Sequence, residues 1–207
     1  MLNRTVEIAP DRPHLHGATL AQQHLSEVLP ALNSLNGDAT LFVLDLSSAA
    51  SVTGSYLRGI VHWALLCGQA EANGGPHPSG TDKWAVRPLP LFPVIFGGSE
   101  EVVDDVNDFF RARNLPILQA TKRPKSALKS ARLLGSLDRY LASTLFSLTK
   151  LREATAADIA AKSDESITVN AWSNRLGDLY GLRLVTRRRA GKFWLYSPLA
   201  QDIKTWA

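Results

Sequence analysis

The sequence predicts an N-terminal α/β domain followed by a smaller domain of three helices and a β-hairpin. Strand and helix patterns alternate over residues 1–120, and three helical patterns precede two short strands over residues 135–207. Charge separates the same two parts. Residues 1–120 hold seven Lys and Arg against twelve Asp and Glu, a net charge of −5, whereas residues 121–207 hold sixteen against seven, a net charge of +9. A basic linker is predicted between them, over residues 121–134.

The elements of the first part follow from residue spacing. A short alternating run at 5–8 predicts a strand, and apolar residues at three- and four-residue intervals over 18–35 predict a helix that ends at Asn36-Gly37-Asp38. The near-continuous apolar run 41–46 is typical of a central strand covered on both faces. A helix over 55–69, a strand over 91–96, a helix capped by Ser99 and a strand over 115–119 complete the pattern. The Gly- and Pro-rich residues 73–93 between them predict a long surface loop that passes into the strand over 91–96.

One motif in this part resembles a known family. Leu44-Asp45-Leu46-Ser47, followed after six residues by Gly54-Ser55-Tyr56-Leu57, resembles the STAS family of anti-sigma-factor antagonists over about residues 4–120. In that family a strand ending in Asp-x-Ser leads to a Ser or Thr that caps the next helix, and a partner kinase phosphorylates this hydroxyl in the antagonists. The resemblance places Ser55 at that position, with Asp45 and Ser47 upstream as further regulatory or ligand-binding candidates. This sequence has Thr53-Gly54 where the antagonists have Asp-Ser.

The sequence does not predict an enzyme. It contains no Gly-rich phosphate loop, no Gly-x-Ser-x-Gly elbow and no metal-ligand spacing among its five histidines, so neither catalytic residues nor a metal or other cofactor are expected. The single cysteine, Cys67, excludes an internal disulfide. The longest apolar stretch, Ile60 to Cys67, is far shorter than the ~20 residues that span a bilayer. A cytoplasmic protein without a membrane segment is therefore expected.

The elements of the second part are three helices and a hairpin. Leucines over 133–151 predict the first helix, and Thr155 with Asp158 imitates a capping box at the start of the second, over 156–161. The third helix, about 168–180, has Val169, Trp172, Leu176 and Leu179 on one face. Strands over 182–188 and 193–196 flank a tight turn at 189–192. Trp172, Phe193 and Trp194 are predicted to belong to the core.

This order of elements is that of a winged helix-turn-helix. Ala156-x-x-Ile159-Ala160, then Asn174-Arg175-Leu176-x-x-Leu179, Gly181-Leu182 and the Arg-rich hairpin resemble the winged-helix domains of bacterial MarR-like regulators over about residues 136–199. The resemblance implies that the third helix reads the DNA major groove and that the hairpin, the wing, meets the backbone or a minor groove.

The residue types on these elements suit DNA. Asn pairs with adenine, Arg with guanine, and Ser and Thr reach base edges or phosphates. The predicted DNA-binding residues are Thr168, Asn170, Ala171, Ser173, Asn174 and Arg175 of the third helix, and Arg187, Arg188, Arg189 and Lys192 of the wing.

The sequence thus predicts a cytoplasmic, double-stranded-DNA-binding transcriptional regulator. Its STAS-like domain is expected to serve dimerisation, protein partner docking or signal input. A homodimer is expected because one reading helix gives modest specificity and paired helices read two half-sites. Two alternatives stay open: an adaptor that binds proteins through both domains, and a regulator that senses a nucleotide or metabolite at Asp45, Ser47 and Ser55.

Overall fold

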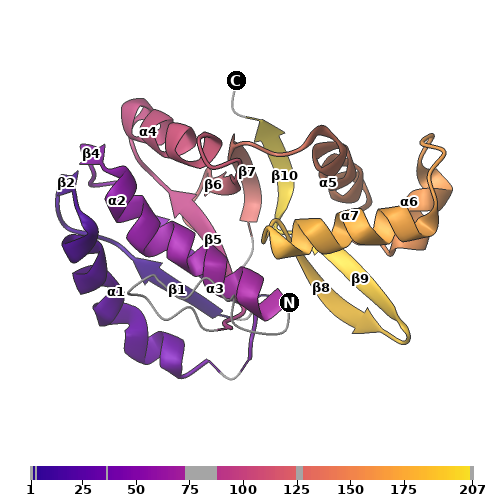
Figure 1. Ribbon diagram of the computed structural model, residues 1–207, viewed down its shortest axis with the longest axis horizontal. Coiled ribbons are helices and arrows are strands. Elements are labelled where there is room, and N and C mark those ends of the chain that lie inside the picture. Colours follow the sequence, from indigo (N-terminus) through magenta and orange to yellow (C-terminus); the bar gives the residue numbers. More distant parts are fainter. Residues whose placement is uncertain (1, 3, 36, 73–87, 125–127, 206–207) are drawn as a thin grey trace.

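A six-stranded sheet forms the centre of the molecule. The computed structural model describes residues 2, 4–35, 37–72, 88–124 and 128–205, and its sheet has the order β1-β3-β5-β6-β7-β10 (Figure 1). Four strands lie parallel in chain order: β1 (Arg4–Ile8), β3 (Thr40–Asp45), β5 (Leu91–Phe96) and β6 (Pro116–Ala120). The strand β7 (Leu128–Gly135) is antiparallel to β6, and β10 (Ala200–Thr205) is parallel to β7.

The helices of the first part cover one face of this sheet. They are α1 (Ala18–Asn33), α2 (Gly54–Leu57), the π-helical turn η1 (Arg58–His62), α3 (Trp63–Ala72) and α4 (Glu100–Arg111). Side chains at alternate strand positions, such as Phe42 and Leu44 of β3, pack against these helices in one buried cluster. A short parallel pair, β2 (His14–Leu15) and β4 (Ser51–Val52), lies beside them.

The predicted helices and strands of the first part are present within a few residues of their expected bounds. The predicted helix over 55–69 is longer, running from Gly54 to Ala72, and the π-helical turn interrupts it. Ser99 caps α4 by accepting a hydrogen bond from the Val102 backbone N–H at 3.4 Å. Most of the predicted surface loop, residues 73–87, lies outside the described residues.

The second part contains the predicted helices and hairpin: α5 (Arg139–Leu151), α6 (Ala156–Lys162), α7 (Val169–Gly181), β8 (Val185–Ala190) and β9 (Phe193–Pro198). The capping box predicted at α6 is confirmed, because the Thr155 side chain accepts from the Asp158 backbone and Asp158 accepts from the Thr155 backbone. The backbone N–H and the hydroxyl of Thr155 both donate to Asp158 Oδ2, each at 2.8 Å, and lower the pKa of the Asp158 carboxyl.

The predicted linker over 121–134 is wrong for residues 128–134, which belong to β7. Leu128, Ala131 and Leu133 are buried on the sheet, while Lys129 and Arg132 point outward. The exposed cations gave the segment its linker-like composition. The helix predicted from Leu133 accordingly begins only at Arg139. Residues 125–127 lie outside the described residues, and β10, which the sequence did not predict, returns the chain to the same sheet.

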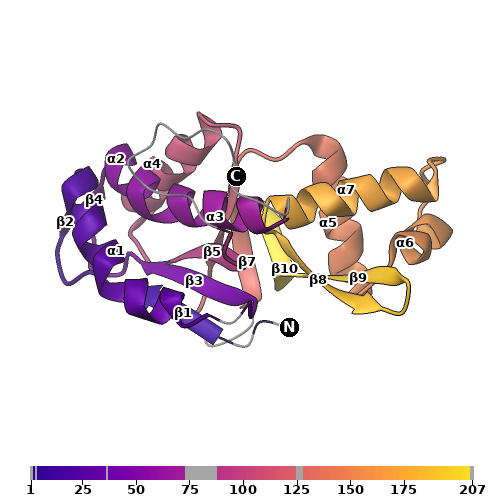
Figure 2. The ribbon, with the colours of Figure 1, turned by 60° about the horizontal axis from the view of Figure 1, so that its bottom comes forward.

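The two parts consequently share a core and are not separated by a linker. The sheet face opposite α1–α4 contributes Leu41, Val43, Phe92 and Val94 to one cluster with Trp172, Leu176, Leu179 and Tyr180 of α7. Figure 2 shows the end of α3 beside the end of α7.

An ion pair between the buried Arg183 and the half-buried Glu71 lies at this junction. The Arg183 side chain is 1% exposed, its Nη2 donates to Glu71 Oε2 at 2.7 Å, and its guanidinium lies 5.0 Å from the Phe92 ring centre. The Tyr180 hydroxyl donates to the same Glu71 oxygen at 2.9 Å. Gly68 makes room for the pair, because a Cβ there would lie 2.6 Å from Arg183 Nε. The contact connects α3 to the segment that leads from α7 into β8.

A buried imidazole makes stability depend on pH. His24 Nδ1 lies 2.7 Å from the Tyr56 hydroxyl, and burial lowers the pKa of His24 while it raises the pKa of Tyr56. The folded state therefore disfavours protonation of His24, whose unfolded pKa is about 6.5. The free energy of unfolding is expected to fall as the pH drops below about 6.5. Urea unfolding at a series of pH values measures this slope; His24→Gln should flatten it, and equal slopes in both proteins would contradict the assignment.

None of the helices in the described part of the chain is both long and apolar enough to cross a membrane.

Candidate nucleic-acid interface

The helix α7 has one buried and one exposed polar face. Trp172, Leu176 and Leu179 are fully buried, and Thr168 caps the helix by accepting from the Ala171 backbone N–H at 3.2 Å. Asn170, Ser173 and Asn174 are exposed on the other face, as predicted, and Ala171 is half-buried. Nothing lies within 4 Å of the place where a Cβ of Gly177 would stand. The exposed face of α7 therefore has short polar side chains that are accessible to solvent.

Two residues of α7 differ in exposure from what the sequence predicted. Val169, predicted on the buried face, is 47% exposed because it stands in the first turn, ahead of the packed part of the helix. Arg175, predicted to contact DNA, has a side chain that is only 17% exposed. Its Nη1 donates to Glu165 Oε2 at 2.8 Å, and its guanidinium lies 4.9 Å from the Trp172 ring centre and 5.2 Å from that of Tyr140.

Arg175 joins elements of the protein rather than pointing to solvent. Its hydrogen bond lowers the pKa of the Glu165 carboxyl, which also accepts from the Ser143 hydroxyl at 3.1 Å. Arg175 thus connects α7 to α5 and to the turn after α6. With its guanidinium held in this way, Arg175 does not belong to the exposed face of α7, which includes Asn170, Ser173 and Asn174.

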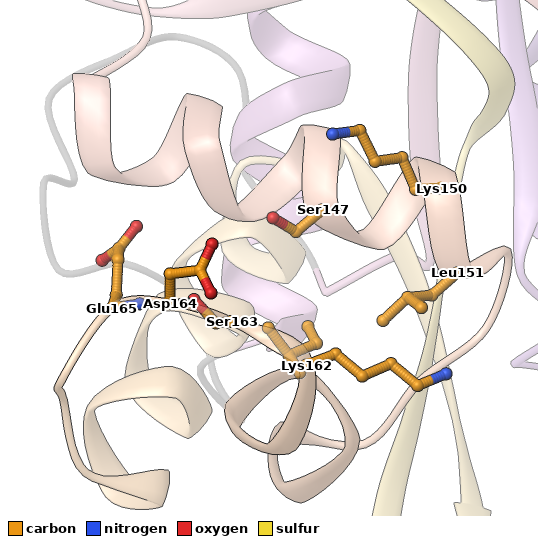
Figure 3. A pocket seen from close by; sticks show the side chains of 8 residues that line it. Ser147, Lys150, Leu151, Lys162, Ser163, Asp164 and Glu165 are labelled. Carbon is orange, nitrogen blue, oxygen red and sulfur yellow. Dashed lines mark hydrogen bonds between the residues drawn. The ribbon is translucent and has the colours of Figure 1, made fainter.

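A hollow of about 430 Å³ lies behind this turn, between α5 and α6 (Figure 3). Figure 3 shows Asp164 and Glu165 on its rim, with Ser147 and Lys150 coming from α5. The lining has two lysines and two carboxylates. Equal numbers of basic and acidic groups favour no charged ligand.

The wing presents two of its arginines on aromatic rings. A turn at Gly191 and Lys192 joins β8 to β9, and Gly191 adopts a positive φ of 61°. The Arg187 guanidinium lies 3.9 Å from the Tyr180 ring centre and 4.4 Å from that of Trp194, and Arg189 lies 3.9 Å from Trp194. Stacking occupies the flat faces of a guanidinium and leaves its N–H edges available to phosphate oxygens.

Arg188 lies on the opposite face of the wing because side chains alternate along a strand. Its Nε and Nη2 donate to the two carboxylate oxygens of Glu153, both at 3.1 Å. The Ser197 hydroxyl donates to the same carboxylate at 3.3 Å. The charge of Arg188 is therefore compensated, whereas Arg187, Arg189 and Lys192 have no carboxylate partner among the ion pairs of the described residues.

The three aromatic residues predicted to be core differ from one another. Trp172 is fully buried, as predicted, and Trp194 is half-buried beneath the stacked arginines. Phe193 is 57% exposed at the tip of the hairpin, so its prediction is wrong. Lys192 Nζ lies 5.5 Å from the Phe193 ring centre. The end of the wing therefore combines a cation with an exposed apolar ring.

The candidate residues of the first part differ in burial and in hydrogen-bond partners. Asp45 is buried; it accepts from the Ser47 backbone N–H at 2.8 Å and is paired with Arg123, which also lies 2.9 Å from Glu7. Ser47 is adjacent and exposed. Ser55 does not cap the helix as predicted, because Thr53 occupies the N-cap position. Ser55 is exposed, and its hydroxyl lies 3.1 Å from that of Thr53.

Within the described residues, no three or more His, Cys, Asp or Glu side chains group closely enough to hold a metal ion. His14 and His16 both approach the Ser51 hydroxyl, at 3.0 Å and 2.7 Å. Cys67 is buried.

The chain matches no protein-family model, no curated protein and no solved structure.

Proposed function

We propose that this protein binds double-stranded DNA through the exposed face of α7 and the wing, and that it acts as a transcriptional regulator. The observation that carries the proposal is the wing: Arg187, Arg189 and Lys192 have no carboxylate partners among the ion pairs of the described residues, and Arg187 stacks on Tyr180 of α7. Duplex DNA carries one negative charge per ~1.7 Å of its axis, so unpaired cations on a protruding hairpin find their counter-charge there.

The two elements have different roles in this proposal. The wing cations hold phosphates or line a minor groove and carry affinity without sequence preference. The α7 face enters the major groove, where Asn170 and Asn174 offer the amide groups that pair with adenine N6 and N7. Thr168 and Ser173 flank them.

The remaining predictions belong to the same proposal. We place the protein in the cytoplasm, assign the STAS-like part to signal input, partner docking or dimerisation, and expect a homodimer. The pairing of Asp45 with Arg123 argues against a direct ligand contact by that carboxylate in the alternative, metabolite-sensing function.

Binding to a duplex at increasing salt tests the function. The full chain is required, since β7 and β10 belong to the same sheet as β6. If three wing cations meet phosphates, the logarithm of the affinity should fall with the logarithm of salt concentration with a slope of about −2.7 or steeper. Fluorescence anisotropy of a labelled duplex measures this slope. Absence of binding at about 50 mM salt would exclude the function.

Asn170→Ala and Asn174→Ala are each expected to relax base preference by about 1 to 3 kcal/mol while leaving the salt slope unchanged. Both side chains are exposed, so their removal leaves the core intact. Selection from a random duplex library, followed by affinities for matched and mismatched sites, measures the preference. Equal loss on all sequences would contradict a reading role for these residues.

A further inference from the structure

The β8–β9 hairpin ends in an exposed aromatic ring. Figures 1 and 2 show the hairpin projecting away from the sheet, with its turn at the far end. Ala190 pairs with Phe193 across the last position before this turn. Phe193 is 57% exposed, which leaves most of an apolar ring in water.

The shape and charge of this tip suit a narrow groove. Ala190 and Gly191 add almost no side-chain bulk, and nothing lies within 4 Å of the Cβ position of Gly191. Lys192 stands beside Phe193, and Arg189 lies one position before the tip on the other face of the hairpin. The apolar ring is thus flanked by cations that would contact phosphates on either side of a minor groove about 6 Å wide.

We propose that Phe193 is a wedge that inserts between neighbouring base pairs of bound duplex DNA from the minor groove and unstacks them. This inference rests on the proposed function. Opening a base step costs stacking energy, which burial of the ring against the base faces offsets. Pyrimidine–purine steps such as TA open most readily, so the wing favours them without any hydrogen bond to a base.

Fluorescence of 2-aminopurine tests the wedge, because this base brightens when it loses its stacking neighbours. The probe is a short duplex with 2-aminopurine at each of several TA steps, and anisotropy of an end label reports binding separately. The full chain is expected to bind and to raise the fluorescence several-fold. Phe193→Ala should still bind, with the same salt slope, and leave the fluorescence near that of free duplex. Phe193→Trp, which keeps a large ring at an exposed strand position, should retain the rise.

The outcomes separate the two proposals. Binding by the unchanged chain without a rise in fluorescence overturns the wedge and leaves DNA binding in place. A rise that persists in Phe193→Ala assigns the distortion to another group and also overturns the wedge. Absence of binding overturns both. Binding that is restricted to single strands carrying 2-aminopurine would contradict insertion into a duplex.

Discussion

Glu71→Ala is expected to lower the free energy of unfolding by about 3 kcal/mol, because it leaves the buried Arg183 guanidinium without its ion-pair partner, although Glu71 itself is 32% exposed. The Arg183 side chain is 1% exposed, and Glu71 is its ion-pair partner among the described residues. Arg183 Nε and Nη1 have no hydrogen-bond partner there, so loss of the carboxylate leaves a buried charge without compensation. The Tyr180 hydroxyl loses its acceptor as well. Urea unfolding, followed by tryptophan fluorescence, measures the change.

Two variants serve as controls. Glu153→Ala breaks the exposed pair with Arg188, whose side chains are 39% and 51% exposed, and should cost less than about 1 kcal/mol. Glu71→Ala combined with Arg183→Met also removes the buried charge of Arg183, and it should recover much of the lost free energy of unfolding. If Glu71→Ala costs no more than Glu153→Ala, the Arg183–Glu71 pair does not hold the helical part on the sheet.

Arg189→Ala with Lys192→Ala is expected to remove much of the affinity for duplex DNA. Both side chains are exposed, and neither has a carboxylate partner among the described residues. Each cation that neutralises a phosphate adds about 0.9 to the salt slope, so the double variant should lose about 1.8 of it. Between 1 M and 0.1 M salt this corresponds to a factor of about 60 in affinity. Anisotropy titrations at several salt concentrations give both values.

The matched control is Arg188→Ala with Glu153→Ala. It removes the bidentate pair on the opposite face of the wing without changing the net charge. Its salt slope should equal that of the unchanged chain. The distinction between the compensated Arg188 and the uncompensated Arg189 and Lys192 would be wrong if both double variants lost the same slope.

Local patterns predicted most of the helices and strands. Caps and apolar spacing act over three or four residues, so Ser99, Thr155 and the buried face of α7 could be read directly. The alternation of side chains along a strand is also enough to predict that Arg188 lies on the face opposite Arg187 and Arg189. The partner that compensates it, Glu153, comes from the segment between α5 and α6, and no local signal pointed to it. The ion pair of Arg175 with Glu165, which lies in the turn before α7, was equally without a local signal.

Long-range pairing could not be predicted. β7 and β10 lie far apart in the chain, and polar and charged residues interrupt the apolar residues of each. The composition of β7 therefore resembled that of a linker, and nothing in the composition of β10 predicted a strand. The Arg183–Glu71 pair joins helical and α/β residues whose proximity depends on the same sheet. The shared core follows from the fold and not from any motif.

Hydrogen–deuterium exchange of the full chain, with and without a saturating duplex at low salt, tests the central claim most directly. It reports which backbone segments a partner covers or stabilises, whatever sequence the protein prefers. The account predicts slower exchange on DNA addition over residues 168–178 of α7 and its cap and over residues 187–194 of the wing, with little change in α1 and α4. Slowing confined to the α/β part, or unchanged exchange in α7 and the wing when anisotropy shows binding, would contradict it.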